Sequence, residues 1–324
     1  MSDDGALLPV VRADKLADAS EAQRWLVTSL WARAAVGILG GAPKCCKSWL
    51  ALDLAVSVAS RTPCLGRFAV EDPGAVMLYM AEDSAAVVKT RLQGLCWHRG
   101  IGLDGVPIDV ITAPSVRIDR EGDQERLART VRRGAPRLLV LDPFVRLHRV
   151  DENDAGQVSA VLGYLRALQR DLDVAVLVVH HARKNGGAGG QAGQSLRGSG
   201  DLHAWGDSNL YLRRQRDALM LTIEHRAAAA PDPLALGLVA TAGGDAHLAI
   251  LDPGGDHARD AAGLEQTIVS TLAAAGEPLG RTALRDKMRV RNERLGEALT
   301  HLANRGAIVR VGDRWRVPVP ATTP

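Results

Sequence analysis

The feature that most constrains the fold of this chain is the stretch G-A-P-K-C-C-K-S at residues 41–48. It follows the apolar run 34–39 and leads into a predicted apolar helix over 48–59. A strand, a tight turn and a helix in this order are typical of a phosphate cradle, because loop N–H groups and the positive end of the helix face the phosphates. Lys47 would add a positive charge, and Ser48 a hydroxyl for a magnesium ion.

The stretch departs from the phosphate-loop pattern G-x-x-x-x-G-K-[ST] at one position, where Cys46 replaces the second glycine. Glycine at that point lets the backbone approach the phosphates without an intervening Cβ. We therefore expect nucleotide affinity and turnover to be reduced. The alternative is an apolar strand, turn and helix that share the pattern without binding a nucleotide.

Further along the chain, short apolar runs alternate with segments that have a helical pattern. The runs are residues 74–81, 107–112, 137–141 and 174–179. Short continuous apolar runs suit strands that are buried on both faces. Their alternation with helices predicts an α/β fold with a mostly parallel central sheet and crossover connections.

Polar residues follow three of these predicted strands. Glu82 and Asp83 follow the first run, Asp142 follows the third, and His180 and His181 follow the fourth. The carboxyl ends of parallel strands form the edge where ligands bind in open α/β sheets. Asp142 stands where a carboxylate would hold magnesium, Glu82 could polarise an attacking water, and a histidine could donate to a phosphate. The alternative for Glu82 is a structural role as an acid in the first turn of the next helix, a position for which Asp83 competes. The alternative for each histidine is an ordinary hydrogen-bonded side chain.

The composition favours a globular intracellular protein. The chain has 324 residues, a net charge of +3 and four cysteines. The cysteines show no metal-binding spacing, and two of them lie inside the loop 41–48, so we expect free thiols in a reducing cytosol. No apolar stretch reaches the roughly 18 residues that span a bilayer, so we expect a cytoplasmic protein without a membrane partner.

The second half of the chain changes in character. Residues 185–200 are glycine-rich and predict a loop, and antiparallel strands are expected beyond it, over 209–213, 218–224 and 234–251. A turn-rich patch after residue 251 predicts a domain boundary. The predicted organisation is a lead-in at 1–33, a phosphate-loop domain at 34–255 and a small C-terminal domain at 256–324.

Three helices and a hairpin are predicted in the C-terminal domain, over 264–275, 281–288, 292–305 and 308–317. This combination is typical of a winged helix-turn-helix. Residues 281–316 contain ten lysines or arginines against four acids, a local charge that attracts nucleic acid. The predicted base-reading residues are Arg291, Asn292 and Arg294, and the predicted phosphate contacts are Arg310, Arg314 and Arg316. The alternative is a protein-docking or oligomerisation module.

Taken in order, several motifs resemble those of a known family. These are the stretch 41–55, the triplet A-E-D at 81–83, the segment from Asp142 to 154 and the run H-H-A-R-K at 180–184. They resemble the RecA-like ATPase core of the RepA-type plasmid replicative helicases, over about residues 25 to 250. The resemblance implies ATP hydrolysis with Mg²⁺ by a ring, usually a hexamer, that moves along single-stranded DNA.

The same resemblance assigns roles by position. It makes Lys47 and Ser48 the Walker A pair, Glu82 the catalytic base, Asp142 the Walker B acid and His181, ahead of His180, the phosphate sensor. It also implies nucleotide contacts, which are Gly41, Ala42, Pro43, Lys44, Cys45, Cys46, Lys47, Ser48, Trp49 and Arg91.

A ring ATPase places an arginine from the neighbouring subunit against the phosphates. The candidates are Arg197, Arg213 and Arg214, each of which has the alternative of being a solvated surface residue. The loop 185–200, bounded by Lys184 and Arg197, would face a central pore and follow the DNA backbone.

Two interpretations remain open from the sequence. The first is a DNA-dependent ATPase of a plasmid, phage or integrated element. The second is a DNA-binding regulator or loader in which the nucleotide only sets the oligomeric state, which Cys46 favours. A recombinase-like filament is a weaker third, since the winged helix lies at the wrong end of the chain.

Overall fold

The computed structural model describes residues 8, 10–16, 20–152, 154–181, 200–215, 218–240, 246–251, 256–288 and 292–318. The chain divides into two compact units, Met1–Ile250 and Leu251–Pro324. The domain boundaries proposed from the sequence, at 33/34 and 255/256, stay predictions. Each unit is described below by itself.

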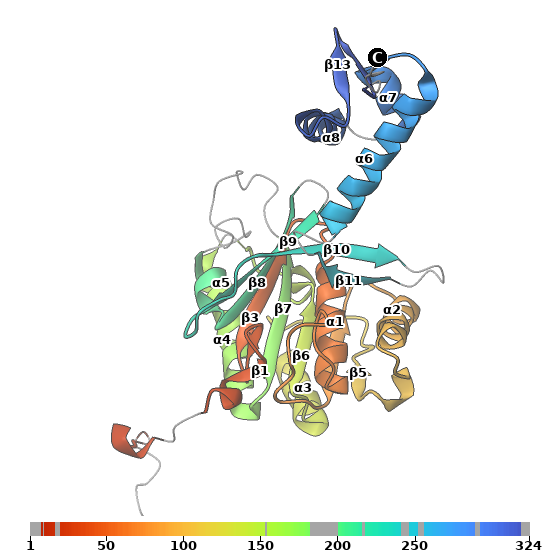
Figure 1. Cartoon of the computed structure of the whole chain (residues 1–324). Helices are drawn as coiled ribbons and strands as arrows, with labels where there is room; N and C mark the ends of the chain where they lie inside the picture. Colours follow the sequence, from red (N-terminus) through yellow and green to blue (C-terminus); the bar gives the residue numbers. More distant parts are fainter. Residues whose placement is uncertain are drawn as a thin grey trace, which may run out of the picture. The chain divides into compact units, whose positions relative to one another are not determined.

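The first unit is built on a nine-stranded sheet in the order β11-β10-β9-β8-β3-β7-β6-β4-β5 (Figure 1). Six neighbouring strands run parallel: β3 (Val36–Gly41), β4 (Val76–Met80), β5 (Ile108–Val110), β6 (Leu138–Asp142), β7 (Ala175–His181) and β8 (Ser208–Gln215). The strands β9 (Ala218–His225), β10 (Leu234–Ala240) and β11 (Ala246–Ile250) add antiparallel pairs. The predicted α/β fold with a mostly parallel sheet is therefore confirmed.

One strand differs from its prediction. β8 was expected to be antiparallel, but it pairs parallel with β3 on one side and antiparallel with β9 on the other. Gly37 makes this close pairing possible, because a Cβ at Gly37 would lie 1.7 Å from the carbonyl oxygen of Ser208. The expected strand over 234–251 is divided into two strands, β10 and β11.

Helices cover both faces of this sheet. The helices α1 (Lys47–Ser60) and α2 (Ala85–His98) pack on one face, and α3 (Glu121–Gly134), α4 (Ala155–Leu172) and α5 (Gly200–Trp205) pack on the other. Along β6, Leu138 and Val140 belong to the first core, and Leu139 and Leu141 to the second. Because successive side chains of a strand point to opposite faces, a strand that is covered on both sides is apolar throughout.

The segment before β3 contributes to the same core. It contains the short strands β1 (Trp25–Val27) and β2 (Trp31–Ala32), which pair antiparallel. Leu26, Leu30 and Trp31 are fully or almost fully buried in the core beneath α1. Short 3₁₀ turns complete the connections: η1 (Ala13–Lys15), η2 (Ala22–Arg24), η3 (Leu103–Gly105) and η4 (Phe144–Arg146).

The second unit contains three helices and a three-stranded sheet. The helices are α6 (Asp256–Ala275), α7 (Arg281–Met288) and α8 (Asn292–Asn304), and the strands are β12 (Leu279–Gly280), β13 (Val309–Val311) and β14 (Arg314–Arg316). A small aliphatic core that includes Ile268, Leu295 and Leu302 holds them together. The three helices and the hairpin are those that the sequence predicted, but α6 begins before the expected residue 264, and β12 adds a third strand that was not predicted. Within the described part of the chain, no helix combines the length and the apolar character that crossing a membrane requires.

Candidate active site

The predicted phosphate loop connects β3 to α1. β3 ends at Gly41 and α1 begins at Lys47, so residues 42–46 form the turn. The backbone is tightly packed where the loop leaves the sheet, since a Cβ at Gly41 would lie 2.3 Å from the carbonyl oxygen of Leu212 on the neighbouring strand β8. The position therefore has space only for glycine, and the sheet holds the base of the loop in place.

Cys46 occupies the glycine position of the loop in a glycine-like conformation. Its φ is 61°, in the left-handed region, and it is the N-cap of α1. A residue with a Cβ costs roughly 1–2 kcal/mol in that region compared with the right-handed one. The loop thus keeps the backbone conformation that the glycine pattern predicts, while the Cβ and thiol of Cys46 lie beside the pocket.

Cys46→Gly is expected to raise ATP affinity by roughly three- to tenfold, the equivalent of about 0.7–1.4 kcal/mol. Glycine fits the left-handed backbone without strain and removes the Cβ from the phosphate approach. Titration calorimetry with ATP and Mg²⁺ measures the change. Cys46→Ala is the matched control, because it removes the sulfur and keeps the Cβ. Equal affinities for all three proteins would show that the Cβ does not limit the approach.

Lys47 is held by the loop that it follows. Its Nζ donates to the carbonyl oxygens of Gly41 and Ala42, each at 2.9 Å, and lies 3.9 Å from Cys45 Sγ. Burial lowers the pKa of Lys47, and the nearby Cys45, Asp142 and Glu82 raise it in part. The lysine is therefore buried at the loop, where a bound phosphate would compete with the two carbonyls for its Nζ.

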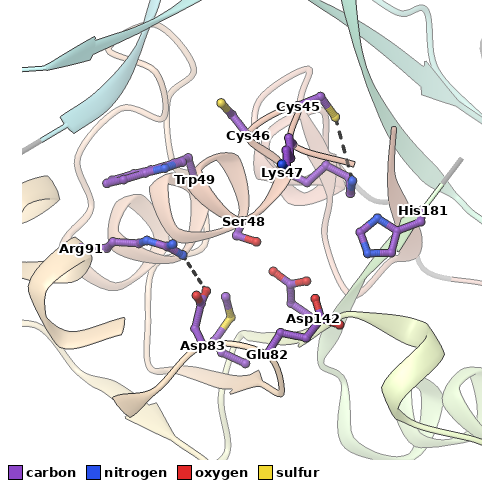
Figure 2. A pocket seen from close by; sticks show the side chains of 12 residues that line it. Cys45, Cys46, Lys47, Ser48, Trp49, Glu82, Asp83, Arg91, Asp142 and His181 are labelled. Atoms are coloured by element: carbon purple, nitrogen blue, oxygen red, sulfur yellow. Dashed lines mark hydrogen bonds and ion pairs between the residues drawn. The ribbon is translucent and has the colours of Figure 1, made fainter. Parts of the chain in front are cut away.

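Asp142, at the end of β6, is a buried acid that faces the loop. Its side chain and that of Ser48 point into the same pocket (Figure 2). Burial raises the pKa of Asp142 to about 6, while Ser48 and Lys47 act to lower it. Its Oδ2 atom is buried and finds no hydrogen-bond partner among the described residues. A buried oxygen left unsatisfied beside a hydroxyl suits the ligand set of Mg²⁺, which prefers oxygen ligands.

Glu82 and Asp83 follow β4 and have different partners. Glu82 lines the pocket and accepts a hydrogen bond from Arg146 Nε at 2.9 Å. Asp83 forms an ion pair with Arg91 at 2.6 Å. The N-cap of α2 is Ser84, whose side chain accepts from the Val87 N–H. Neither acid is thus the cap of this helix, and both line the pocket, with the Asp83 carboxylate turned toward Arg91 (Figure 2).

Arg91 and Trp49 form one wall of the pocket. The guanidinium of Arg91 lies over the Trp49 ring, 5.3 Å from its centroid, and Asp83 fixes its other side. A guanidinium and an indole ring both offer a flat surface on which a planar base can stack. This wall stands beside the loop residues Cys46 and Ser48 in the same pocket.

The two histidines at the end of β7 face different surroundings. His181 lines the pocket on the side away from Trp49 and Arg91 (Figure 2). His180 is 1% exposed, and its ring packs edge-on to Phe144 at 5.7 Å between centroids. The alternation of side chains along a strand explains why only one of two adjacent histidines reaches the pocket.

The pocket has a volume of about 310 Å³. Ten residues predicted from the sequence line it: Lys44, Cys45, Cys46, Lys47, Ser48, Trp49, Glu82, Arg91, Asp142 and His181. Met80 and Asp83 also line it. Gly41, Ala42 and Pro43 belong to the loop but do not line the pocket. His180, which is not in the loop, does not line it either.

The remaining predicted residues lie elsewhere. Arg213, on β8, is exposed and does not line the pocket. Arg214, also on β8, donates to the carbonyl oxygen of Lys44 in the phosphate loop of the same chain at 3.5 Å. Arg310, Arg314 and Arg316 are exposed on the hairpin of the second unit. Lys184, Arg197 and Arg291 lie outside the described residues, as do the side chains of Asn292 and Arg294.

Sequence reasoning missed Arg146, which pairs with Glu82. Nothing in its sequence context distinguishes it from other surface arginines, because its partner is 64 residues away. Glu82 and Arg146 come together because β4 and β6, the strands that they follow, are neighbours in the sheet.

Comparison with known proteins agrees with this geometry. Residues 3–187 match the family model described as an AAA domain, which is more than half of the chain. The chain belongs to the AAA domain family. Its fold is similar to that of a DnaB-like replicative helicase studied with its primase, with a TM-score of 0.53 and 17% identity. The similarity covers 68% of this chain and 59% of that one, less than two thirds of its length.

A KaiC-like protein from the hyperthermophilic archaeon Pyrococcus horikoshii OT3 also matches, with a TM-score of 0.48 and 12% identity. That match covers 70% of this chain and 94% of the archaeal one. The family and the helicase fold confirm that this AAA domain has the predicted RecA-like P-loop ATPase fold. The RepA-type resemblance and the winged helix stay predictions.

Proposed function

We propose that this AAA domain protein is an ATP-hydrolysing, DNA-associated ring ATPase of the RepA helicase type. The observation that carries the proposal is the pocket in which Glu82 and Asp142, from the ends of two neighbouring strands, meet Lys47 and Ser48 of the loop. The proposed setting is the replication of a plasmid, phage or integrated element in the cytoplasm.

Five pocket residues have a role in the proposed reaction. Lys47 leaves the Gly41 and Ala42 carbonyls and contacts the phosphates. Ser48 and Asp142 would hold Mg²⁺, which neutralises phosphate charge during phosphoryl transfer. Glu82 accepts a proton from the attacking water. His181 donates to the γ-phosphate. Because the pKa of Asp142 is about 6, its carboxylate is mostly ionised at neutral pH and can hold the cation.

The nucleic acid contacts in the proposal lie in two places. Single-stranded DNA passes through the pore of a hexamer, where Lys184 tracks the backbone, and Arg197 or Arg213 reaches the neighbouring active site. The domain at 256–324 is a winged helix that binds duplex DNA through Arg291, Asn292, Arg294 and the hairpin arginines at 310, 314 and 316. Support comes from the helix and strand order of the second unit and from its exposed hairpin arginines.

A second candidate function is a nucleotide-controlled DNA-binding regulator or loader with little motor activity. Three observations favour it: Lys47 is bonded to its own loop, Glu82 is paired with Arg146, and Cys46 places a Cβ beside the pocket. The contacts of Lys47 and Glu82 would have to break before hydrolysis. A protein that binds ATP and rarely completes that change would act as a switch.

ATP turnover with and without DNA separates the two candidates. The full chain is assayed alone, with single-stranded DNA and with duplex, beside Lys47→Ala. Turnover that single-stranded DNA stimulates, and that Lys47→Ala loses, is expected for the motor. ATP binding and duplex binding without turnover would support the regulator. Absence of ATP binding in calorimetry would contradict both.

A further inference from the structure

A second cavity lies on the other side of the end of β4. It has a volume of about 220 Å³, and its lining includes Tyr79 and Ala81, whereas Met80 and Glu82 line the first pocket. Because successive side chains point to opposite sides of a strand, one strand end supplies both cavities. Four arginines complete the second cavity, which we call the arginine pocket: Arg117, Arg120, Arg146 and Arg149.

The arginine pocket carries positive charge that is only partly balanced. No acidic side chain is among its lining residues. Arg117 pairs with Asp119 at 3.0 Å and Arg146 pairs with Glu82 at 2.9 Å. Arg120 and Arg149 make no ion pair with any residue that the structure describes. At least two guanidinium groups are therefore available to an anion from solution.

Uncharged donors accompany these arginines. The Tyr79 hydroxyl, on a side chain that is 3% exposed, accepts the Val116 N–H at 3.1 Å, so its own O–H can donate into the cavity. Ser115 adds a second hydroxyl. Arg120 is the N-cap of α3 and its side chain makes no cap bond, while the first turn of this helix carries Glu121 and Asp123, which offset the positive end of the helix.

The chemistry of these donors selects a phosphate group. Planar guanidinium forks bind phosphate oxygens in pairs, and hydroxyls bind the same oxygens. The cavity is smaller than the first pocket and falls below the roughly 300–1,000 Å³ of typical small-molecule sites. Its volume accommodates one phosphate group with water.

We propose that the arginine pocket binds a phosphate group, either of a nucleic-acid backbone or free in solution, and that this binding draws Arg146 away from Glu82. Arg146 is the residue that joins the two cavities, since it lines the second and pairs with an acid of the first. A phosphate in the arginine pocket competes with Glu82 for the same guanidinium. The consequence for hydrolysis rests on the proposed function, in which the released Glu82 is the catalytic base.

Binding to the arginine pocket is measured without ATP. The probes are a fluorescent oligothymidylate, inorganic phosphate and pyrophosphate, and the variant is Arg120→Gln/Arg149→Gln. The matched control is Arg132→Gln/Arg133→Gln, which removes the same charge from two exposed arginines in the last turn of α3. We expect the pocket variant to bind the oligonucleotide about tenfold more weakly, and the control to bind as the wild type does.

The salt dependence and the competition then identify the source of the phosphate. For a nucleic-acid backbone, the loss of two phosphate contacts makes the plot of log affinity against log salt concentration shallower by about 1.4. For a free anion, inorganic phosphate or pyrophosphate binds the wild type and the control at one more site than the pocket variant, because the phosphate loop is intact in all three proteins. Equal binding of all three probes by the wild type and the pocket variant would overturn the proposal.

Arg146→Gln tests the connection to Glu82. We expect basal ATP turnover to rise several-fold in this variant, and stimulation by the pocket ligand to disappear. Unchanged basal turnover would refute the release of Glu82. A wild type that hydrolyses no ATP would instead refute the proposed function, and the binding measurements would still decide whether the arginine pocket holds phosphate.

Discussion

Glu82→Gln is expected to lower ATP turnover by about 10²- to 10⁴-fold, the usual contribution of a positioned general base. The amide keeps the shape of the side chain but cannot accept a proton from water. ATP affinity should stay close to that of the wild type, because Lys47, Ser48 and Asp142 remain in the pocket. The expected signature is thus a fall in kcat with an unchanged dissociation constant for ATP.

Steady-state hydrolysis and titration calorimetry with ATP and Mg²⁺ measure the two quantities. Asp83→Asn is the matched control, because it changes the adjacent carboxylate in the same way. Asp83 holds Arg91, which stacks on Trp49, so its loss is expected to weaken nucleotide affinity and leave kcat nearly intact. If Asp83→Asn abolishes turnover and Glu82→Gln does not, the base is Asp83.

Asp53→Ala is expected to lower the free energy of unfolding by about 3–5 kcal/mol, because it leaves a buried charge without its partner. Asp53 lies on α1, is 2% exposed, and pairs with Arg99 at 2.8 Å. Its Oδ1 also accepts the Leu65 N–H at 2.9 Å and faces the Cys64 thiol at 3.3 Å. Removing the Asp53 carboxylate leaves the buried guanidinium of Arg99 without its acidic partner and the Leu65 N–H without its acceptor.

Urea unfolding followed by circular dichroism measures this loss. Asp14→Ala is the control, since it breaks an exposed ion pair to Arg12 at 3.1 Å and is expected to cost less than about 1 kcal/mol. A similar small loss for Asp53→Ala would mean that water or a rearranged side chain compensates Arg99.

Much of the site could be predicted from the sequence because it depends on local rules. The loop at 41–48 is recognised from its spacing, and the strands before Glu82, Asp142 and His181 from their apolar runs. Parallel strands bring their carboxyl ends to one edge, so these residues meet the loop once the strands are assigned. The antiparallel pairing of β8 with β9 was predicted, but its parallel pairing with β3 was not, because that contact joins segments far apart in the sequence.

The sequence by itself determined the phosphate loop, the apolar strands and the acids at their ends, because side-chain periodicity and turn chemistry act over a few neighbouring residues. Only the tertiary structure decided that Arg146 pairs with Glu82 and that β8 runs parallel beside β3. These outcomes depend on which distant segments become neighbours in the sheet. That order is set by the packing of the whole unit, which no local pattern records.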